Sequence, residues 1–298
     1  MDTTVNNNST PGTFKKGLIL EGGAMRGMFT AGVIDVLLEN NVQFDGIAGV
    51  SAGAVFGCNF KSKQIGRAIR YNKKYCKDPR YCSIRSLIKT GDLYNTDFCY
   101  RQIPEFLDPF DRQTFQNNPI EFFLGATDVN TGKCMYHQCT DGGQTDIKWM
   151  QASASMPLVS RPVFVDGHLL LDGAISDSVP YRFMEQKGYN CNLIVLTQPD
   201  GYQKHKSKLS PLLRFLLRKF PAVREAMLSR HQMYNRQMEE IKQREQKGIS
   251  FVIRPPKALG ISRTEHNPDE LERVYQTGRL EAERNLPALK RFLSLSNE

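Results

Sequence analysis

Short apolar runs alternate with segments of helical spacing along the first 200 residues, and this alternation most constrains the fold. Runs typical of buried strands lie at residues 17–20, 44–50, 120–129 and 192–199. Residues 28–41 carry apolar side chains at helical intervals, residues 64–76 look helical and strongly basic, and residues 147–156 predict a helix that Pro157 ends. This order predicts a layered α/β fold with a mainly parallel sheet.

The remaining segments predict how the chain is divided. Strands are expected at 133–139 and 249–256, and residues 162–174 predict a hairpin with Asp166-Gly167 as its tight turn. Residues 1–15 are polar and are expected to be a disordered lead-in. Between Asp200 and Glu225, seven Lys or Arg residues occur without an acidic one. We therefore expect one layered domain at 16–200 and a basic, mostly helical C-terminal region at 201–298.

Net charge and cysteine content limit which binding partners and which cellular compartment we expect for the protein. A net charge of +9 over 298 residues permits an anionic partner without naming a membrane or a nucleic acid. The seven cysteines include no C-x-x-C pair, and no histidine pair completes a zinc pattern. We expect buried thiols, a cytoplasmic location and no metal site. No run of 18 apolar residues occurs, the N-terminus does not resemble a secretory signal, and no D-x-D-x-D-G calcium loop is present.

Residues Gly49-Val50-Ser51-Ala52-Gly53 follow an apolar run and have the G-x-S-x-G spacing of a nucleophile elbow. In such an elbow a strand turns abruptly into a helix. Glycine on both sides leaves room for the serine side chain to project from the turn. The same residues could form a small-residue junction without chemistry, so the rest of the chain must decide between the two interpretations.

A glycine-rich loop, Gly22 to Gly27, lies between a predicted strand and a predicted helix. Successive N–H groups in such a loop can point into one concavity and bind negative charge. A dinucleotide site is disfavoured, because Ala24 replaces a fingerprint glycine and the second strand ends in the elbow rather than in an acidic residue. An oxyanion hole beside Ser51 is favoured, since the first two strands of such sheets are commonly neighbours.

A serine nucleophile needs a group that takes its proton, and Asp172 is the best-placed candidate. It ends the apolar run HLLLD and is followed by Gly173 and Ala174, which leave space for close approach. A carboxylate can act as the base if partial burial raises its pKa. Two alternatives remain open, namely a simple Asp-Gly turn and a triad whose histidine is His205, His231 or His266.

Taken in this order, the three motifs resemble those of the patatin-like phospholipases of the bacterial, cytosolic type, over residues 16–200. The resemblance implies a three-layer α/β/α sandwich, Ser51 as nucleophile and Asp172 as proton acceptor. It also implies an oxyanion hole formed by the N–H groups of Gly22, Gly23 and Ala24. Its supporting residues would be Arg26, Gly27, Gly49, Gly53 and Gly173. Many members have glycine at position 24, and alanine there costs little if its φ is negative.

The resemblance implies a lipid acyl hydrolase of the phospholipase A type that needs no cofactor and binds no nucleic acid. Two alternatives are an esterase or thioesterase for soluble acyl substrates and a non-enzymatic lipid-binding protein. Residues 203–220 could contact an anionic membrane, because Lys204, Lys206 and Lys208 precede an apolar stretch. A helix starting at Pro211 would place Leu213, Leu216, Leu217 and Phe220 on one face. That face could instead pack on the catalytic domain.

Overall fold

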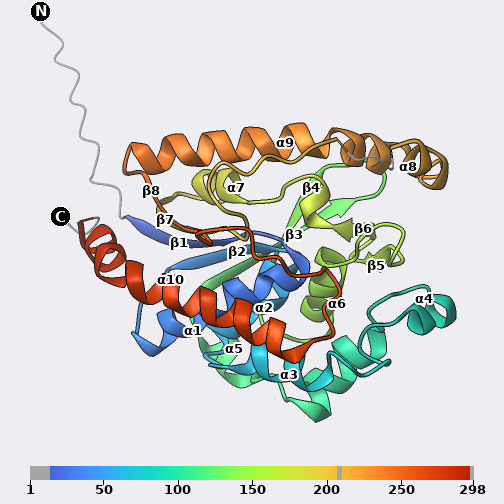
Figure 1. Ribbon diagram of the computed structural model, residues 1–298, viewed down its shortest axis with the longest axis horizontal. Coiled ribbons are helices and arrows are strands. Elements are labelled where there is room, and N and C mark those ends of the chain that lie inside the picture. Colours follow the sequence, from blue (N-terminus) through green and yellow to red (C-terminus); the bar gives the residue numbers. More distant parts are fainter. Residues whose placement is uncertain (1–13, 207–209, 296–298) are drawn as a thin grey trace, which may run out of the picture.

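The computed structural model describes residues 14–206 and 210–295, and within them an eight-stranded sheet forms the centre of the molecule (Figure 1). The strand order is β5-β6-β3-β2-β1-β7-β8, and β4 pairs with β3 outside this path. The strands are β1 (Lys15–Leu20), β2 (Gly46–Val50), β3 (Glu121–Asp128), β4 (Cys134–Cys139), β5 (Val163–Val165), β6 (His168–Asp172), β7 (Tyr189–Val195) and β8 (Ser250–Ile253). Strands β1, β2, β3, β7 and β8 run parallel, whereas β4, β5 and β6 pair in antiparallel fashion. The prediction of a mainly parallel α/β sheet is confirmed.

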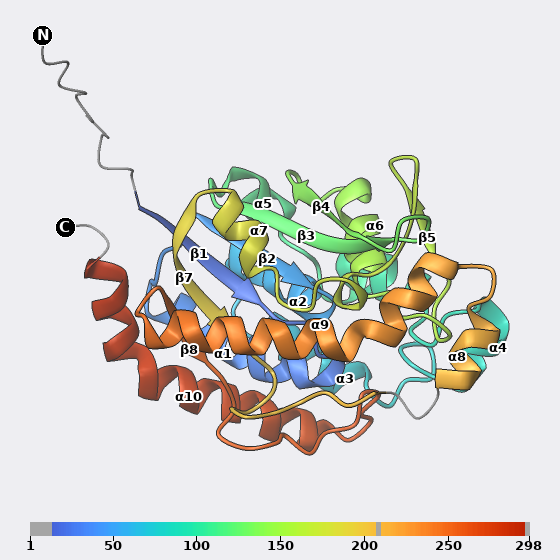
Figure 2. The same cartoon turned by 90° about the horizontal axis from the view of Figure 1, so that it is seen from above.

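Helices cover both faces of the sheet, as Figures 1 and 2 show. Helices α1 (Gly27–Glu39), α2 (Ala52–Lys61) and α10 (Pro268–Leu295) lie on one face, and α7 (Tyr181–Gln186) and α9 (Pro221–Gln246) lie on the other. The shorter helices are α3 (Arg67–Tyr75), α4 (Ile84–Thr90), α5 (Arg112–Asn117), α6 (Gln144–Ser153) and α8 (Ser210–Leu216). Of the helices in the described residues, none combines the length and apolar character needed to cross a membrane.

Side-chain alternation along the central strands explains the three layers. In β1, Leu18 and Leu20 belong to the core beneath α1 and α2, whereas Ile19 belongs to the core beneath α7 and α9. In β7, Leu193 and Ile194 divide in the same way. Successive strand residues point to opposite faces, so a strand buried on both faces is apolar throughout. This explains why the short apolar runs in the sequence correspond to central strands.

The predicted hairpin is present as β5 and β6. Asp166 and Gly167 form its two-residue turn with φ values of 50° and 80°. Positive φ at both central residues is the type I′ arrangement, which matches the twist of antiparallel strands. The predicted helices 28–41, 64–76 and 147–156 appear as α1, α3 and α6, and α6 ends before Pro157.

The chain beyond residue 200 completes the same sheet rather than forming a second one. Strand β8 pairs in parallel with β7, and α10 packs along α1. The two helices meet at glycines, because a methyl group on Gly32 would lie 2.1 Å from the Tyr275 carbonyl oxygen and one on Gly278 would lie 2.0 Å from that of Phe29. At this crossing Tyr275 also donates a hydrogen bond of 2.7 Å to Asp35.

Helix α8 corrects one detail of the sequence analysis. Leu213 and Leu217 are buried against a small cluster that includes Ile175 and Val223, but Leu216 is 46% exposed. The helix ends at Leu216, so the long apolar face expected through Phe220 does not form as one helical stripe. Part of this segment packs on the protein, and part of it faces outward.

Candidate active site

The turn between β2 and α2 has the conformation expected of a nucleophile elbow. Ser51 has φ 54° and ψ −125°, a strained region for a residue other than glycine. A methyl group on Gly49 would lie 2.5 Å from the Gly53 carbonyl oxygen, and one on Gly53 would lie 2.4 Å from that of Leu20. Both glycines are therefore required by close backbone approach. Together they let the turn hold Ser51 at the carboxyl end of the central sheet.

Ser51 is held by a serine that the sequence analysis missed. The backbone N–H of Ser51 donates to Ser153 Oγ at 2.9 Å, and Ser153 Oγ donates to the Gly125 carbonyl at 2.6 Å. Ser153 belongs to α6, and its side chain is fully buried. The residue types around Ser153 gave no signal of this, and only the contact with Ser51 reveals a positioning role. Ser153 thus fixes the elbow to β3.

Asp172 lies directly against Ser51, as the motif pairing predicts. Ser51 Oγ donates a hydrogen bond of 2.7 Å to Asp172 Oδ2, and the N–H of Ala174 donates one of 2.8 Å to Asp172 Oδ1. The sheet register produces this contact, because Val50 pairs with Gly125 in β3 and the next residue, Ala126, pairs with Asp172 in β6. Gly173 is required for this approach, since a methyl group there would lie 2.1 Å from the Gly125 carbonyl oxygen.

The surroundings of Asp172 make it more basic than an ordinary aspartate. Its side chain is fully buried, and this burial raises its pKa. The hydrogen bond from Ser51, the positive charge of Arg230 and the N–H of Ala174 oppose the effect in part. The carboxylate therefore combines direct contact with the Ser51 hydroxyl and a raised affinity for a proton. No histidine lies between the two groups, because their oxygens are already in hydrogen-bond contact.

The glycine-rich loop lies beside Ser51. A methyl group on Gly22 would lie 2.9 Å from the Ser51 Cβ. The N–H of Gly22 makes a long bond of 3.4 Å to the Ser178 carbonyl, whereas over the described residues no hydrogen bond is donated by the N–H of Gly23 or Ala24. Of the three predicted oxyanion-hole donors, Gly23 and Ala24 are therefore the two whose N–H groups are free to donate to a ligand within the described residues.

The backbone of Ala24 does not have the negative φ that an unstrained alanine would have. Its φ is 49°, in the left-handed region that glycine occupies freely. A non-glycine residue there costs about 1 kcal/mol. The loop holds this strain next to Ser51, which is strained as well. Such strain is common where a loop is held in position for chemistry.

Arg26 and Gly27 complete the loop. The Nε atom of Arg26 is buried and has no hydrogen-bond partner within the described residues. A methyl group on Gly27 would lie 2.8 Å from the Ala52 Cβ, so this glycine lets α1 approach the first turn of α2. The four glycines predicted as supporting residues, Gly27, Gly49, Gly53 and Gly173, therefore make close approaches around the Ser51 turn, and Arg26 lies in the adjoining loop.

An apolar cavity of about 300 Å³ opens next to Ser51. Ala24 and Met25 line it on the loop side, and its wall is formed largely by apolar and aromatic side chains, among them Val55, Phe56, Tyr71, Tyr100, Ile103 and Met150. Apolar walls with a few polar groups at one end are typical of sites for a largely hydrocarbon ligand. The cavity has the character needed to hold an acyl chain whose ester reaches Ser51.

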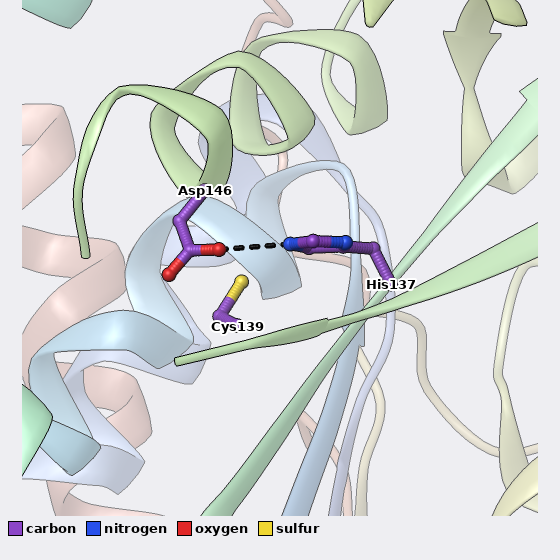
Figure 3. A group of neighbouring side chains, drawn as sticks. All are labelled: His137, Cys139 and Asp146. Carbon is purple, nitrogen blue, oxygen red and sulfur yellow. Dashed lines mark hydrogen bonds and ion pairs between the residues drawn. The ribbon is translucent and has the colours of Figure 1, made fainter. Parts of the chain in front are cut away.

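A second polar cluster joins β4 to the start of α6 (Figure 3). His137, Cys139 and Asp146 place their possible ligand atoms within 4.8 Å of one another. His137 Nε2 lies 2.8 Å from Asp146 Oδ1, and Asp146 Oδ2 accepts hydrogen bonds from the N–H groups of Thr140, Asp141 and Gly142. These bonds use the lone pairs that a metal ion would need. The cluster therefore anchors the start of α6 by hydrogen bonds, and we base no metal site on it.

Comparisons with known families identify two parts of the chain. The family model described as patatin-like phospholipase matches residues 18–184, which contain the three motifs. A model described as a domain of unknown function (DUF6363) matches residues 220–294, which contain α9, β8 and most of α10. The description of this C-terminal family names no activity.

Three curated proteins illustrate the range of relatives. A Caenorhabditis elegans protein whose name includes the words patatin-like phospholipase domain-containing is 27% identical over 190 residues, which are 58% of this chain and 16% of that protein. An uncharacterized protein of Escherichia coli is 26% identical over 88% of this chain and 74% of its own length. A lysophospholipase of Aspergillus niger is 25% identical over 58% of this chain and 11% of its own length. The match of the family model over residues 18–184 shows that this chain belongs to the patatin-like phospholipase family.

Proposed function

We propose that this protein is a serine hydrolase of lipid acyl esters. The observation that carries the proposal is the 2.7 Å hydrogen bond between Ser51 Oγ and the buried carboxylate of Asp172 at the end of an apolar cavity. Membership of the family and the lysophospholipase among the relatives support a lipid substrate. The cytoplasmic location expected from the cysteine pattern is part of the same proposal.

The proposed reaction has two halves. Asp172 takes the proton of Ser51 as Oγ attacks the ester carbonyl, and the N–H groups of Gly23 and Ala24 donate to the resulting oxyanion. Asp172 then returns the proton to the leaving alkoxide, which releases the alcohol and leaves an acyl-serine. A water molecule, deprotonated by Asp172, then attacks the acyl carbonyl, and Asp172 passes that proton to the departing Ser51 Oγ, which frees the fatty acid and restores the serine hydroxyl. Buried Asp172 suits this role because its raised pKa favours proton transfer at moderate pH.

Removing either dyad residue tests the mechanism. We expect Ser51→Ala and Asp172→Asn each to lower kcat for a lysophospholipid by about 10³-fold or more, because the two groups act as one unit. His231→Ala is the control and should stay within about tenfold, since it takes no part in the proton transfer. Turnover is measured by mass spectrometry of released fatty acid, and melting temperature confirms that each variant is folded.

Two results would contradict the dyad. An Asp172→Asn enzyme with near wild-type turnover would remove the base from the mechanism. Failure of a fluorophosphonate probe to label Ser51 in an otherwise folded protein would favour a non-enzymatic lipid-binding protein. Hydrolysis of short soluble esters without hydrolysis of long-chain lipids would instead favour the soluble-substrate alternative.

We also propose that residues 203–220 contact an anionic membrane. On α8, Phe215 is 61% exposed, and the exposed Arg214 and Arg218 lie beside it. The exposed isoleucines of α4, Ile84 and Ile88, lie at the same end of the molecule (Figures 1 and 2). Apolar side chains with neighbouring cations suit the interface of an anionic bilayer, where the substrate would be found.

A further inference from the structure

Three polar side chains of α9 face the candidate active site rather than solvent. Arg230, Tyr234 and Gln237 are four and three positions apart, so they lie on one face of the helix. Tyr234 and Gln237 are buried, and Arg230 is half-buried. A helix that covers a sheet usually buries apolar side chains, and buried polar ones need hydrogen-bond partners. We call these three residues the α9 row, and their partners show what the row does.

Arg230 contacts the residue that binds the candidate base. Its Nε donates to the Ala174 carbonyl at 2.6 Å, and the N–H of Ala174 donates to Asp172 Oδ1 at 2.8 Å. Ala174 therefore lies between the arginine and the carboxylate. Burial raises the pKa of Asp172, and the positive charge of Arg230 opposes this effect. Arg230 thus acts on the base through a hydrogen bond to its neighbour and through its charge.

Gln237 holds the chain farther along the same segment. Its Nε2 donates to Asp177 Oδ1 at 2.6 Å and to the Val179 carbonyl at 3.2 Å, and its Oε1 accepts the N–H of Ser178 at 3.2 Å. One amide side chain therefore binds three successive residues. Together with Arg230, it ties both ends of the segment that follows the base to one helix.

Tyr234 extends the contact to the start of the glycine-rich loop. Its hydroxyl donates to Glu21 Oε1 at 2.9 Å, and Glu21 Oε2 accepts the N–H of Thr197 at 2.5 Å. Glu21 is buried and immediately precedes Gly22, whose N–H lies 3.4 Å from the Ser178 carbonyl. The two active-site loops therefore meet each other and are both bound to α9.

We infer that the α9 row positions the base and the oxyanion loop of the candidate active site. The inference rests on the proposed hydrolase function and adds three positioning residues to it. Catalytic groups displaced by about 1 Å can lose about 10²-fold in rate, so such contacts matter for turnover. The row lies in residues 220–294, which match a domain of unknown function, whereas the dyad lies in residues 18–184. The C-terminal region thus completes an active site whose reacting groups lie elsewhere in the chain.

Two tyrosines of the C-terminal region allow a matched comparison. Tyr234 and Tyr275 are both buried, and each donates to a buried carboxylate, that of Glu21 at 2.9 Å and that of Asp35 at 2.7 Å. We expect Tyr234→Phe to lower the second-order rate constant for fluorophosphonate labelling of Ser51 about tenfold, because it releases the glycine-rich loop. Tyr275→Phe removes the same kind of bond at the crossing of α1 and α10, and it should leave the rate constant within about twofold.

Two arginines of α9 provide the second comparison. Arg244 donates to Glu185 of α7 at 2.8 Å, whereas Arg230 donates to an active-site segment. We expect Arg230→Met to lower kcat for a short soluble ester about tenfold with little change in KM, because the contact acts on the base and not on substrate binding. Arg244→Met should keep both constants within about twofold.

A double variant tests whether Arg230 acts through Asp172. In an Asp172→Asn background, Arg230→Met should lower the residual rate by less than about twofold, since the base is already absent. A tenfold loss in both backgrounds would show that Arg230 acts elsewhere, and it would overturn its positioning role.

Melting temperatures show whether each variant is folded. The Ala174 carbonyl also accepts a hydrogen bond of 2.9 Å from the Ser178 hydroxyl, so Arg230→Met leaves this buried oxygen with a partner. If Arg230→Met nevertheless fails to fold, Tyr234→Phe still tests the inference, because it removes a single oxygen atom and keeps the ring.

The outcomes separate this inference from the proposed function. If wild-type Ser51 is not labelled and no ester is hydrolysed, the hydrolase proposal fails, and the inference fails with it. If the wild type is active but folded Tyr234→Phe and Arg230→Met behave like their controls, only the positioning inference is wrong. Equal losses in Tyr275→Phe and Arg244→Met would show a general effect of weakened packing and would also overturn it.

Discussion

At the scale of single residues, Asp172 combines the two properties of a base, namely contact with the Ser51 hydroxyl and a raised pKa. Because burial disfavours its charged form, the folded protein keeps a proton on Asp172 at pH values where the unfolded chain has lost it. The free energy of unfolding therefore decreases as pH rises from the usual value of 3.8 to the raised pKa. The buried Asp172 carboxyl group is thus retained at some cost to stability.

The pH profile of the proposed hydrolysis would report on the protonation of Asp172. Activity on a short neutral ester should fall as pH decreases through the raised pKa of Asp172, since only the carboxylate accepts a proton. The positive charge of Arg230 favours that carboxylate, so Arg230→Met should move the acidic limb upward by about 1 pH unit. Lys247→Met is the matched control. A limb that stays in place in a folded Arg230→Met protein would show that Asp172 does not set it.

At the scale of secondary-structure elements, α8 divides its side chains between the protein and the solvent. Leu213 of the helix and Leu217, the residue after its end, are buried, whereas Phe215 and Leu216 are 61% and 46% exposed. The buried leucines stabilise the fold, and the exposed Phe215 and Leu216 are available to a lipid interface. The short helix can therefore serve both alternatives that the sequence analysis left open.

Substitution of the outward side chains tests the membrane role of α8. We expect Phe215→Ser/Leu216→Ser to weaken binding to vesicles containing anionic lipid by about tenfold or more, because each side chain loses its apolar transfer energy. Hydrolysis of a soluble ester should remain within about twofold, since the change is away from Ser51. Leu280→Ser removes a leucine that is 63% exposed on α10 and is the control. Unchanged sedimentation with vesicles would assign this face to a protein partner or to solvent.

At the scale of the whole molecule, the C-terminal region is part of the central layers. Strand β8 covers the edge of β7, and α10 covers α1 at the Gly32 and Gly278 crossing. A chain ending at residue 200 would expose that edge and a buried helix face. The change in composition near residue 200 therefore marks a difference in charge between two parts of the chain that pack around the same sheet.

Truncation tests this integration. We expect residues 1–200 to aggregate or to unfold without a cooperative transition, because β8 and α10 supply buried contacts on one face of the sheet. A chain lacking only residues 296–298 serves as the control and should melt like the full protein. Thermal unfolding and size-exclusion chromatography make the comparison. A soluble 1–200 fragment with a cooperative transition would instead establish residue 200 as a domain boundary.

The amino-acid sequence determined the order of strands and helices, the elbow around Ser51 and the pairing of three motifs. These are local patterns, in which apolar periodicity, glycine spacing and turn residues act within a few positions. The hairpin turn at Asp166-Gly167 is predictable for the same reason. The resemblance to a family then linked Ser51 with Asp172, although 121 positions separate them.

Only the tertiary structure decided which distant groups surround the dyad. The register of β2, β3 and β6 brings Asp172 to Ser51, and the packing of α6 brings Ser153 to the elbow. Arg230 carries no local signal in a basic helix, and its contact with Ala174 depends on how α9 lies on the sheet. The positive φ of Ala24 likewise has no signal in the residue types around it. Such features depend on long-range packing, which residue types and spacing along the chain do not specify.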